Sequence, residues 1–387
     1  MLSPSFSTAT EYETKTITAI NADGTLTLNS ALAYTHYGAS GVTISNHYGK
    51  IDTRTRVGHL TRNIKVVPGP DAGWGYTIHV YGFLDGQIPR VGAAQVTGVE
   101  FYKGGQYDSM KYGLVFLNSQ NGNHSSSLSD NSFHNCQGGC LYIKNSQDIT
   151  MKNNIFYKGY QYLVQTNTIK KVVFDGNLMI GVMEKYTLLP GYELVACIFV
   201  ETSVLKADGV SIKDNYCLGS PRHGFAVPFS SCGDFEANPV ANNTAGSCDI
   251  GHIINTNGAQ CQAFSYAKAF ACNIGQICGS PGIVEIKLDH FIMVDNVRGI
   301  TLKHGAREGG SSHTANLYNS YVNAVSRPTC DYCYGPSATI CTDVHGMRLF
   351  TASANGEVMP AKFGHGFDVI CKQPVYDSKA YLENCTF

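Results

Sequence analysis

The chain carries little charge: 15% of its 387 residues are charged, with 28 basic side chains against 29 acidic ones. No cluster of Lys and Arg occurs along it. Proteins that bind nucleic acid or anionic membranes present a basic stripe or patch. The composition therefore argues against both partners, and it predicts a surface of uncharged polar residues and tyrosines.

Long apolar runs are absent as well. The longest uncharged apolar run, Leu194 to Val200, is far too short to cross a bilayer. The first residues, Met1 to Pro4, lack the basic and apolar regions of a secretory signal. Since the cysteines described next indicate secretion, we expect a fragment of a longer precursor without a transmembrane segment of its own.

Cysteine does not occur before Cys136, and all 14 cysteines follow from there. An even number of cysteines without a repeated metal-ligand spacing is typical of a secreted, oxidised protein. The disulfide candidates are Cys136, Cys140, Cys197, Cys217, Cys232, Cys248, Cys261, Cys272, Cys278, Cys330, Cys333, Cys341, Cys371 and Cys385. Their pairing stays open, and Cys136 and Cys140 can either close on themselves or reach neighbouring coils.

The only C-x-x-C pair, Cys330 and Cys333, lacks a second pair of ligands, so structural half-cystines are favoured over a zinc or redox site. No metal or cofactor is expected. Three sequons begin at Asn123, Asn242 and Asn384 and fit the pattern for N-glycosylation. Together with the cysteines they indicate the secretory pathway and an extracellular or cell-surface location.

One phrase of apolar alternation and a polar corner is repeated along the middle of the chain. Its asparagines, Asn131, Asn154 and Asn177, follow each other at intervals of 23 residues, and Asn215 ends a further copy. A fixed period in the twenties without helical spacing is typical of a coil that stacks on copies of itself. We therefore predict a parallel β-helix in which these four corner amides form a ladder from coil to coil.

The first 66 residues predict antiparallel strands instead. Thr14 to Ile20 and Thr25 to Leu28 alternate in polarity and are joined by a turn that contains Asp-Gly, which favours a hairpin. Two further strand-like runs span Gly41 to Ser45 and Asn63 to Val67.

Three phrases carry a resemblance to a known family. The segment from Arg56 to Ile64 resembles the end of the G8 domain of fibrocystin, fibrocystin-like proteins and the cell-migration-inducing hyaluronidases. The segment from Val96 to Gln106 is similar to the β-helix segment that follows this domain, and Ser132 to Cys140 is similar to the first full coil.

The resemblance implies an all-β, disulfide-rich chain with a partial G8-like domain followed by a right-handed parallel β-helix. The predicted boundaries are residues 1–70 for the G8-like part, 71–93 for a junction and 94–325 for the β-helix. Residues 326–387 are expected to form an irregular cysteine-containing cap or the start of a further element, since an open coil end needs cover. Tyr186 to Glu193 and Ser230 to Ser247 are expected as loops.

A catalytic constellation is not evident. A glycosidase needs two carboxyl groups about 5 to 9.5 Å apart, yet no Asp-Asp pair occurs, and Asp175, Asp214 and Asp295 occupy corner phrases where turn capping is favoured. The strand from Gly113 to Asn118, where the resemblance leads us to expect a histidine in the hyaluronidases, is apolar. No catalytic residue is assigned.

Histidines and tyrosines remain as candidates for other roles. The histidines are mostly beside glycine, which favours hydrogen-bonding corners over catalytic bases: His223, His252, His304, His345 and His365. The tyrosines fall into two groups that can present an outward aromatic row or pack on strands: Tyr157, Tyr160 and Tyr162, and Tyr318, Tyr321, Tyr332 and Tyr334.

These features predict a non-catalytic extracellular or cell-surface glycoprotein segment with a structural or adhesive role, which could be a subunit of a fibrous assembly. Its expected partners are glycans, other extracellular proteins or further copies of itself. One alternative is a glycan-cleaving β-helix enzyme of the hyaluronidase-like branch. Another is a receptor ectodomain that binds a glycan or protein ligand.

Overall fold

The computed structural model describes most of the chain. The described residues are 1–6, 8–38, 42–45, 49–70, 73–107, 111–119, 124–183, 195–201, 208–228, 230–232, 239–254, 261–278, 285–296, 298–304, 313–324, 365–371 and 378–383. The predicted loop at Tyr186 to Glu193 and most of the predicted C-terminal cap lie outside them.

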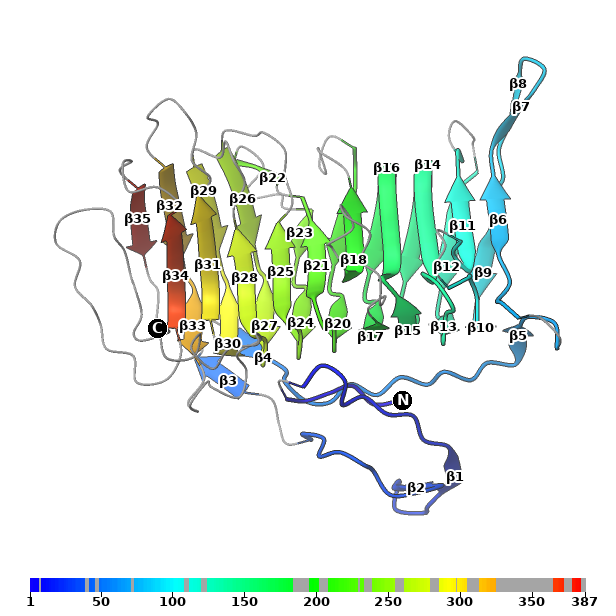
Figure 1. The fold of residues 1–387 in the computed structure, drawn as a ribbon, viewed down its shortest axis with the longest axis horizontal. Coiled ribbons are helices and arrows are strands. Elements are labelled where there is room, and N and C mark those ends of the chain that lie inside the picture. Colours follow the sequence, from blue (N-terminus) through cyan, green and yellow to red (C-terminus); the bar gives the residue numbers. More distant parts are fainter. Residues whose placement is uncertain are drawn as a thin grey trace.

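The chain winds into a parallel β-helix with three faces, which confirms the all-β, parallel β-helix part of the predicted fold class (Figure 1). One face is a 10-stranded parallel sheet. Its strands in spatial order are β5 (Ile64–Val66), β10 (Val99–Tyr102), β13 (Ser132–His134), β15 (Ile155–Tyr160), β17 (Leu178–Met183), β20 (Tyr216–Leu218), β24 (Thr244–Gly246), β27 (Lys268–Phe270), β30 (Ile292–Asn296) and β33 (Tyr321–Ala324).

The second face follows the first in every coil. Its strands are β6 (Ile78–Tyr81), β11 (Leu114–Leu117), β14 (Leu141–Lys152), β16 (Tyr162–Asp175), β18 (Ala196–Glu201), β21 (His223–Val227), β25 (Ile250–Ile254), β28 (Ile274–Cys278), β31 (Arg298–His304) and β34 (His365–Cys371). The long strands β14 and β16 turn a corner at residues with positive φ, Asn145 and Asp148 in one and Thr168 and Lys171 in the other, and continue into the third face.

The third face is completed by shorter strands. They are β9 (Gln95–Thr97), β12 (Ser126–Ser129), β19 (Ser211–Lys213), β23 (Val240–Ala241), β26 (Cys261–Ser265), β29 (Glu285–Asp289), β32 (His313–Tyr318) and β35 (Ser378–Glu383), with β22 (Ser230–Ser231) antiparallel to β26. The predicted loop from Ser230 to Ser247 therefore contains β22, β23 and β24 within its described residues.

The interior is filled by columns of apolar side chains, one per coil. Phe101, Phe133 and Phe156 occupy one register position, and their rings stack with centroids 4.5 and 4.9 Å apart. All three are almost completely buried. Burial of each ring contributes about 1.5 to 3 kcal/mol, and it requires the coils above and below, so the stack supplies the core that a single coil lacks.

The corners between the third and first faces share one backbone conformation. The corner residue has positive φ in successive coils, for example Asp130, Asn153 and Gly176 with φ of 57°, 54° and 64°. Glycine suits this corner at Gly176 because it adopts positive φ without strain. This recurrent left-handed turn fixes the position of the residue that follows it.

The residues after these corners form an asparagine ladder: Asn131, Asn154, Asn177, Asn215 and Asn243, all buried. The Nδ2 of each of the first four donates to the Oδ1 of the next asparagine at 2.9 to 3.1 Å. The Oδ1 of each of the last four also accepts the backbone N–H of the asparagine before it. The ladder satisfies buried amide groups that the turn removes from the sheet. The sequence pattern identified its first four members.

The described residues of an N-terminal segment that ends at residue 63 lie along the outer side of the first face (Figure 1). Its hairpin β1 (Ile17–Ile20) with β2 (Leu26–Leu28) is antiparallel, as predicted, and β3 (Val42–Ser45) pairs with β4 (Gly49–Ile51). Met1, Ile51 and Leu60 pack in one apolar cluster with residues of the first face. The segment thereby covers an apolar sheet face that would otherwise be exposed.

The β-helix is longer than its predicted range of 94–325. β5, inside the predicted G8-like part, pairs with β10, and β6, inside the predicted junction, pairs with β11. At the other end β34 and β35, within the predicted cap, pair with β31 and β32. The apolar alternation of the sequence is interrupted from Pro68 to Gly73 and again after Ser326. These interruptions led to the prediction of domain boundaries there.

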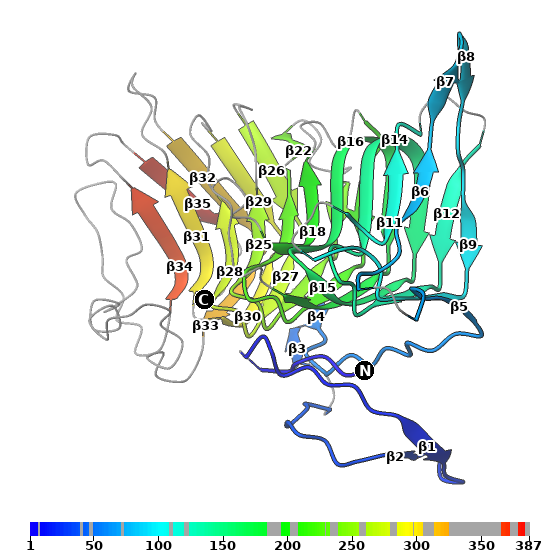
Figure 2. The same cartoon turned by 45° about the vertical axis from the view of Figure 1, so that its right-hand side comes forward.

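A second hairpin, β7 (Phe83–Asp85) and β8 (Ile88–Arg90), extends away from the coils at one end of the solenoid (Figure 2). Among the described residues, no helix is long and apolar enough to cross a membrane.

Candidate functional site

Of the three predicted sequon asparagines, only Asn242 lies among the described residues. Asn242 is exposed at a corner with φ of 56°, while its neighbour Asn243 is buried in the ladder. Asn123 and Asn384 lie outside the described residues. The Asn242 side chain, the predicted acceptor of the middle sequon, is therefore accessible in the folded chain.

Two disulfides join cysteines within the described coils. Cys136 and Cys140 close on themselves around a Gly-Gly turn, and Cys197 joins Cys217 across two faces. Cys232 is also disulfide-bonded. The remaining described candidates include the buried thiols Cys248 and Cys272 and the strand residues Cys261, Cys278 and Cys371. Cys330, Cys333, Cys341 and Cys385 lie outside the described residues.

The buried thiols occupy equivalent corners of adjacent coils. Cys272 is fully buried beside Cys248, and burial raises the pKa of its thiol well above the usual value. A thiol held in its protonated form is a poor nucleophile and metal ligand. Among the described residues, no group of His, Cys, Asp and Glu is arranged to hold a metal ion.

The described histidines do not form a catalytic pair. His223 contacts the Val195 carbonyl oxygen at 3.0 Å, and His252 lies inside the coil stacked on Phe225. Burial lowers the pKa of His252 to about 4, so its ring is neutral at physiological pH. The side chains of His304 and His365 and the whole of His345 are outside the described part.

The three candidate aspartates stay at corners. Asp214 and Asp295 have positive φ of 58° and 54°, and Asp175 ends β16, where its carboxylate lies 3.4 Å from the Lys152 ammonium. These positions match the turn role that the sequence favoured.

On the first face, the buried carboxylate of Glu100 lies in a cluster of titratable groups. Glu100 on β10 contacts His134 at 3.2 Å and Lys65 at 3.1 Å, and its Oε2 accepts the Arg62 N–H at 3.0 Å. Burial alone would raise the pKa of Glu100, but these hydrogen bonds and the His134 charge outweigh it and lower the pKa. The cluster holds an ionised carboxylate that ties the end of the N-terminal segment to the first face.

The tyrosines of the first predicted group do not form one exposed row. Tyr157 is buried beneath the N-terminal segment, where Thr14 donates a hydrogen bond to its hydroxyl, and Tyr162 is buried against Phe199. Of the two alternatives that the sequence left open, packing on strands therefore describes both side chains. Tyr160 remains partly exposed. Tyr318 and Tyr321 are half-buried, and Tyr332 and Tyr334 lie outside the described residues.

Tyr160 instead takes part in a hollow at the corner between the first and second faces. This corner pocket has a volume of about 330 Å³ and is lined by Gly73, Trp74, Gln106, Tyr107, Gln137 and Tyr160. Four consecutive coils contribute to it. The rings of Tyr107 and Tyr160 meet edge to face, with centroids 4.7 Å apart and an interplanar angle of 78°.

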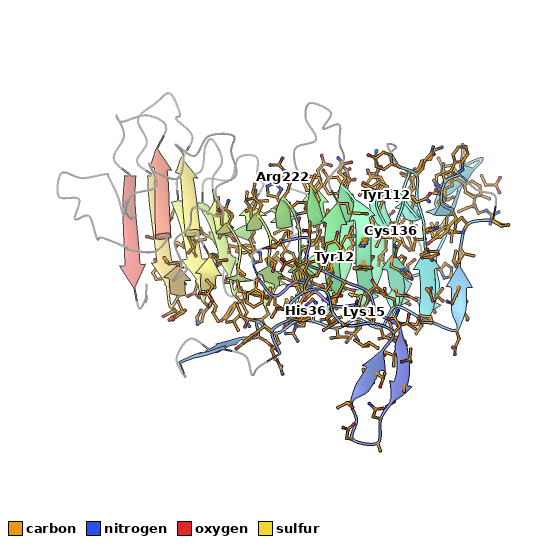
Figure 3. The ribbon with its side chains drawn as sticks, turned by 60° about the horizontal axis from the view of Figure 1, so that its bottom comes forward. Tyr12, Lys15, His36, Tyr112, Cys136 and Arg222 are labelled. Atoms are coloured by element: carbon orange, nitrogen blue, oxygen red, sulfur yellow. A yellow bond between two sulfur atoms is a disulfide. The ribbon has the colours of Figure 1, made fainter. Side chains whose placement is uncertain are left out.

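The backbone around the corner pocket is tightly held. Gln137 donates its backbone N–H to the Gly104 oxygen at 2.8 Å, and Tyr160 donates to the Gly138 oxygen at 2.9 Å. The Cys136–Cys140 disulfide closes the loop that carries Gln137. Figure 3 labels Tyr112 and Cys136, which lie on adjacent coils, and the loop closed by the disulfide packs on the Tyr112 ring.

Glycine is required at two points where these turns stack. A Cβ at Gly75 would lie 1.8 Å from the Lys103 oxygen, and one at Gly138 would lie 2.7 Å from the Lys111 oxygen. Both clashes are with backbone of a neighbouring coil, so neither can be relieved by a side-chain rotation. The close approach of these turns places Trp74, Tyr107 and Gln137 around one hollow.

The sequence reasoning missed Trp74 and Tyr107. Two signals point to them: Trp74 is the single tryptophan of the chain and stands between glycines, and Tyr107 follows the phrase that resembles the first β-helix segment. The contact of these residues with Tyr160 depends on how many residues each coil contains before the corner between the first and second faces. The 23-residue period of the asparagines marks a different corner and does not reveal this number.

Comparisons with known proteins agree with this architecture. Residues 87–246 match the family model described as CEMIP beta-helix. Fibrocystin-L of Homo sapiens is 26% identical over 249 residues, which cover 59% of this chain and 6% of that protein. The chain thus spans a small part of the length of the relative it matches. Its parallel β-helix is similar in sequence to the CEMIP beta-helix and to part of Fibrocystin-L.

Proposed function

We propose that the chain is part of an extracellular or cell-surface protein in which the β-helix acts as a non-catalytic scaffold for binding and adhesion. The disulfides support an oxidising compartment, because such bonds persist mainly in secreted and cell-surface proteins. The relation to fibrocystin-like and CEMIP β-helices supports the same location. Glycans, other extracellular proteins and further copies of the chain are its proposed partners.

The contacts of Glu100 support the non-catalytic role, because they make this buried carboxylate unsuited to act as a glycosidase acid. A glycosidase acid must hold its proton near neutral pH, which requires a raised pKa and a second carboxyl nearby. Hydrogen bonds to Glu100 do the opposite, because Arg62, Lys65 and His134 all stabilise its ionised form. This carboxylate is suited to fastening β5 and the N-terminal segment to the coil.

Incubation with polysaccharides tests the proposal. Hyaluronan, chondroitin, heparan sulfate and neutral polysaccharides are each mixed with the purified chain, and their length is followed by size-exclusion chromatography with light scattering. We expect no shortening, while a known hyaluronidase in a parallel sample shortens hyaluronan. The extracellular location is tested by detecting the protein on intact cells or in their medium.

A decrease in polysaccharide length that disappears in Glu100→Gln would contradict the non-catalytic scaffold and favour the glycan-cleaving alternative. Glu201→Gln serves as the matched control, since Glu201 is exposed on β18. A single mass across the accessible concentration range would remove self-association from the proposed partners and leave binding to other molecules.

A further inference from the structure

The corner pocket has the shape and chemistry of a site for a small polar ligand with a flat apolar side. Its volume of about 330 Å³ lies at the low end of the range of about 300 to 1,000 Å³ for small-molecule sites. Such a space suits one or two ring-sized units. The open corner of a stacked solenoid also leaves room for the rest of a longer chain to extend into solvent.

We infer that the corner pocket binds an uncharged sugar ring of a glycan, an inference that rests on the proposed binding role of the scaffold. The first reason is aromatic surface. Trp74 and Tyr107 are 61% and 42% exposed, and Tyr160 is half-buried. Aromatic rings that combine apolar area with a polar tip are well suited to the C–H face of a pyranose.

The arrangement of the rings adds specificity. Tyr107 and Tyr160 stand nearly perpendicular, so a sugar that stacks on one ring meets the edge of the other. Each tyrosine also carries a hydroxyl that can donate or accept a hydrogen bond. The two walls therefore define an orientation for a flat ring with polar groups around its rim.

The amides supply the polar contacts. Gln106 and Gln137 line the pocket from adjacent coils. A carboxamide offers both an acceptor oxygen and donor hydrogens, which matches adjacent sugar hydroxyls that are themselves donors and acceptors. Because backbone hydrogen bonds and the Cys136–Cys140 disulfide hold the Gln137 loop, little ordering is required when the ligand binds.

None of the described lining residues has an acidic or basic side chain, which favours an uncharged ligand. Two lysines on the neighbouring turns are engaged elsewhere: Lys103 lies over the Tyr102 ring at 5.2 Å, and Lys158 lies over the Tyr12 and Tyr157 rings at 5.1 and 5.4 Å. A carboxylate or sulfate in the pocket would lose hydration without gaining a countercharge from these two lysines.

The single tryptophan makes the test direct, because its fluorescence reports on the corner pocket alone. The folded chain is titrated with chitotriose, lactose and mannotriose, and separately with a hyaluronan hexasaccharide as the acidic probe. We expect saturable fluorescence changes with at least one neutral sugar and at least about tenfold weaker binding of the acidic probe. Tyr107→Ala should weaken the neutral sugar about tenfold, since stacking and area are both lost.

Tyr34→Ala is the matched control, because Tyr34 is 43% exposed but lies on the N-terminal segment. It should bind as the wild type does. Near-ultraviolet circular dichroism verifies that both variants are folded. The inference is overturned if no neutral sugar saturates the signal at millimolar concentrations, if the acidic probe binds as tightly, or if folded Tyr107→Ala binds unchanged. Those outcomes leave the non-catalytic scaffold intact, whereas polysaccharide shortening contradicts the scaffold whatever the pocket binds.

Discussion

Asn177 shows what a single ladder residue contributes. Its Oδ1 accepts the backbone N–H and the Nδ2 of Asn154, and its own Nδ2 donates to the Met151 oxygen and to Asn215. Truncation would leave several buried polar groups without partners, and each such group costs about 1 to 3 kcal/mol. We expect Asn177→Ala to lower the free energy of unfolding by about 3 kcal/mol in urea denaturation.

Asn167→Ala is the matched change outside the ladder, because the amide of Asn167 donates to Glu201 at an exposed position. It should cost less than about 1 kcal/mol. Equal destabilisation by the two variants would show that the ladder contributes no more than a surface hydrogen bond.

His252 provides a pH-dependent test of the interior. Its pKa falls from 6.5 to about 4 in the folded chain because burial disfavours the charged ring. As pH falls, the unfolded state therefore binds a proton at a higher pH than the folded state does. The free energy of unfolding declines as pH falls from about 6.5 to about 4. His252→Phe should reduce this slope in thermal unfolding, while His59→Phe at an exposed position should keep the wild-type slope. A His252→Phe slope identical to that of the wild type would contradict the buried neutral ring.

For individual residues, the sequence predicted the ladder positions where asparagine recurs at a fixed interval. Asn131, Asn154 and Asn177 fall 23 residues apart in sequence and one coil apart in space. The ladder ends after Asn243, since the equivalent corners of the next coils hold Ala267 and Phe291. Nothing in the spacing marks that end, because apolar side chains can fill the same interior position without a hydrogen bond.

At the scale of elements, a disulfide links β18 on the second face to β20 on the first face. The Cys197–Cys217 disulfide spans 20 residues, whereas Cys136–Cys140 spans 4. A longer closed loop restricts the unfolded chain more. We expect the double variant Cys197→Ala/Cys217→Ala to lose about 3 kcal/mol and Cys136→Ala/Cys140→Ala about 2 kcal/mol in equilibrium unfolding. The reverse order would show that loop closure is not the dominant effect.

Strand prediction succeeded where the pattern was periodic and failed at its margins. The hairpin of β1 and β2 follows from its Asp-Gly turn and alternation, and it is present. β5 and β6 were not assigned to the solenoid, because their pairing with β10 and β11 involves no corner asparagine on their own coil. The corner pocket was missed for a related reason, since its residues come from coils that contain different numbers of residues.

For the molecule as a whole, the N-terminal segment is the main departure from a bare stack of coils. Contacts such as Arg56 with the Tyr216 hydroxyl at 2.7 Å join residues 160 positions apart. Sequence periodicity cannot reveal them, because the segment has no repeat of its own. They explain why Tyr157 is buried rather than exposed.

Acid should loosen this segment. Burial alone would raise the pKa of Glu13, yet the pKa falls to about 2 because the Ala33 amide, His36 and Lys15 donate hydrogen bonds to the carboxylate. Figure 3 shows Lys15 and His36 where the segment meets the coils. A lowered pKa stabilises the fold above the unfolded value of 4.5, and this contribution is lost as pH falls toward about 2.

Glu13→Gln should therefore lower the melting temperature at neutral pH and converge with the wild type near pH 2, as followed by differential scanning calorimetry. Glu11→Gln on the same segment is the control, and it should stay close to the wild type throughout. A constant difference between Glu13→Gln and wild type across the acid range would contradict an ionised Glu13 in the fold.

The unequal intervals between ladder asparagines have a practical meaning. Neighbours are 23 residues apart in two steps, then 38 and then 28, yet every step advances the stack by one rung. The number of residues in a coil therefore does not change the rise of that coil along the solenoid axis. A label or reporter peptide inserted between β17 and β18, where the long lap already accommodates extra residues, should leave the columns above and below in their original alignment.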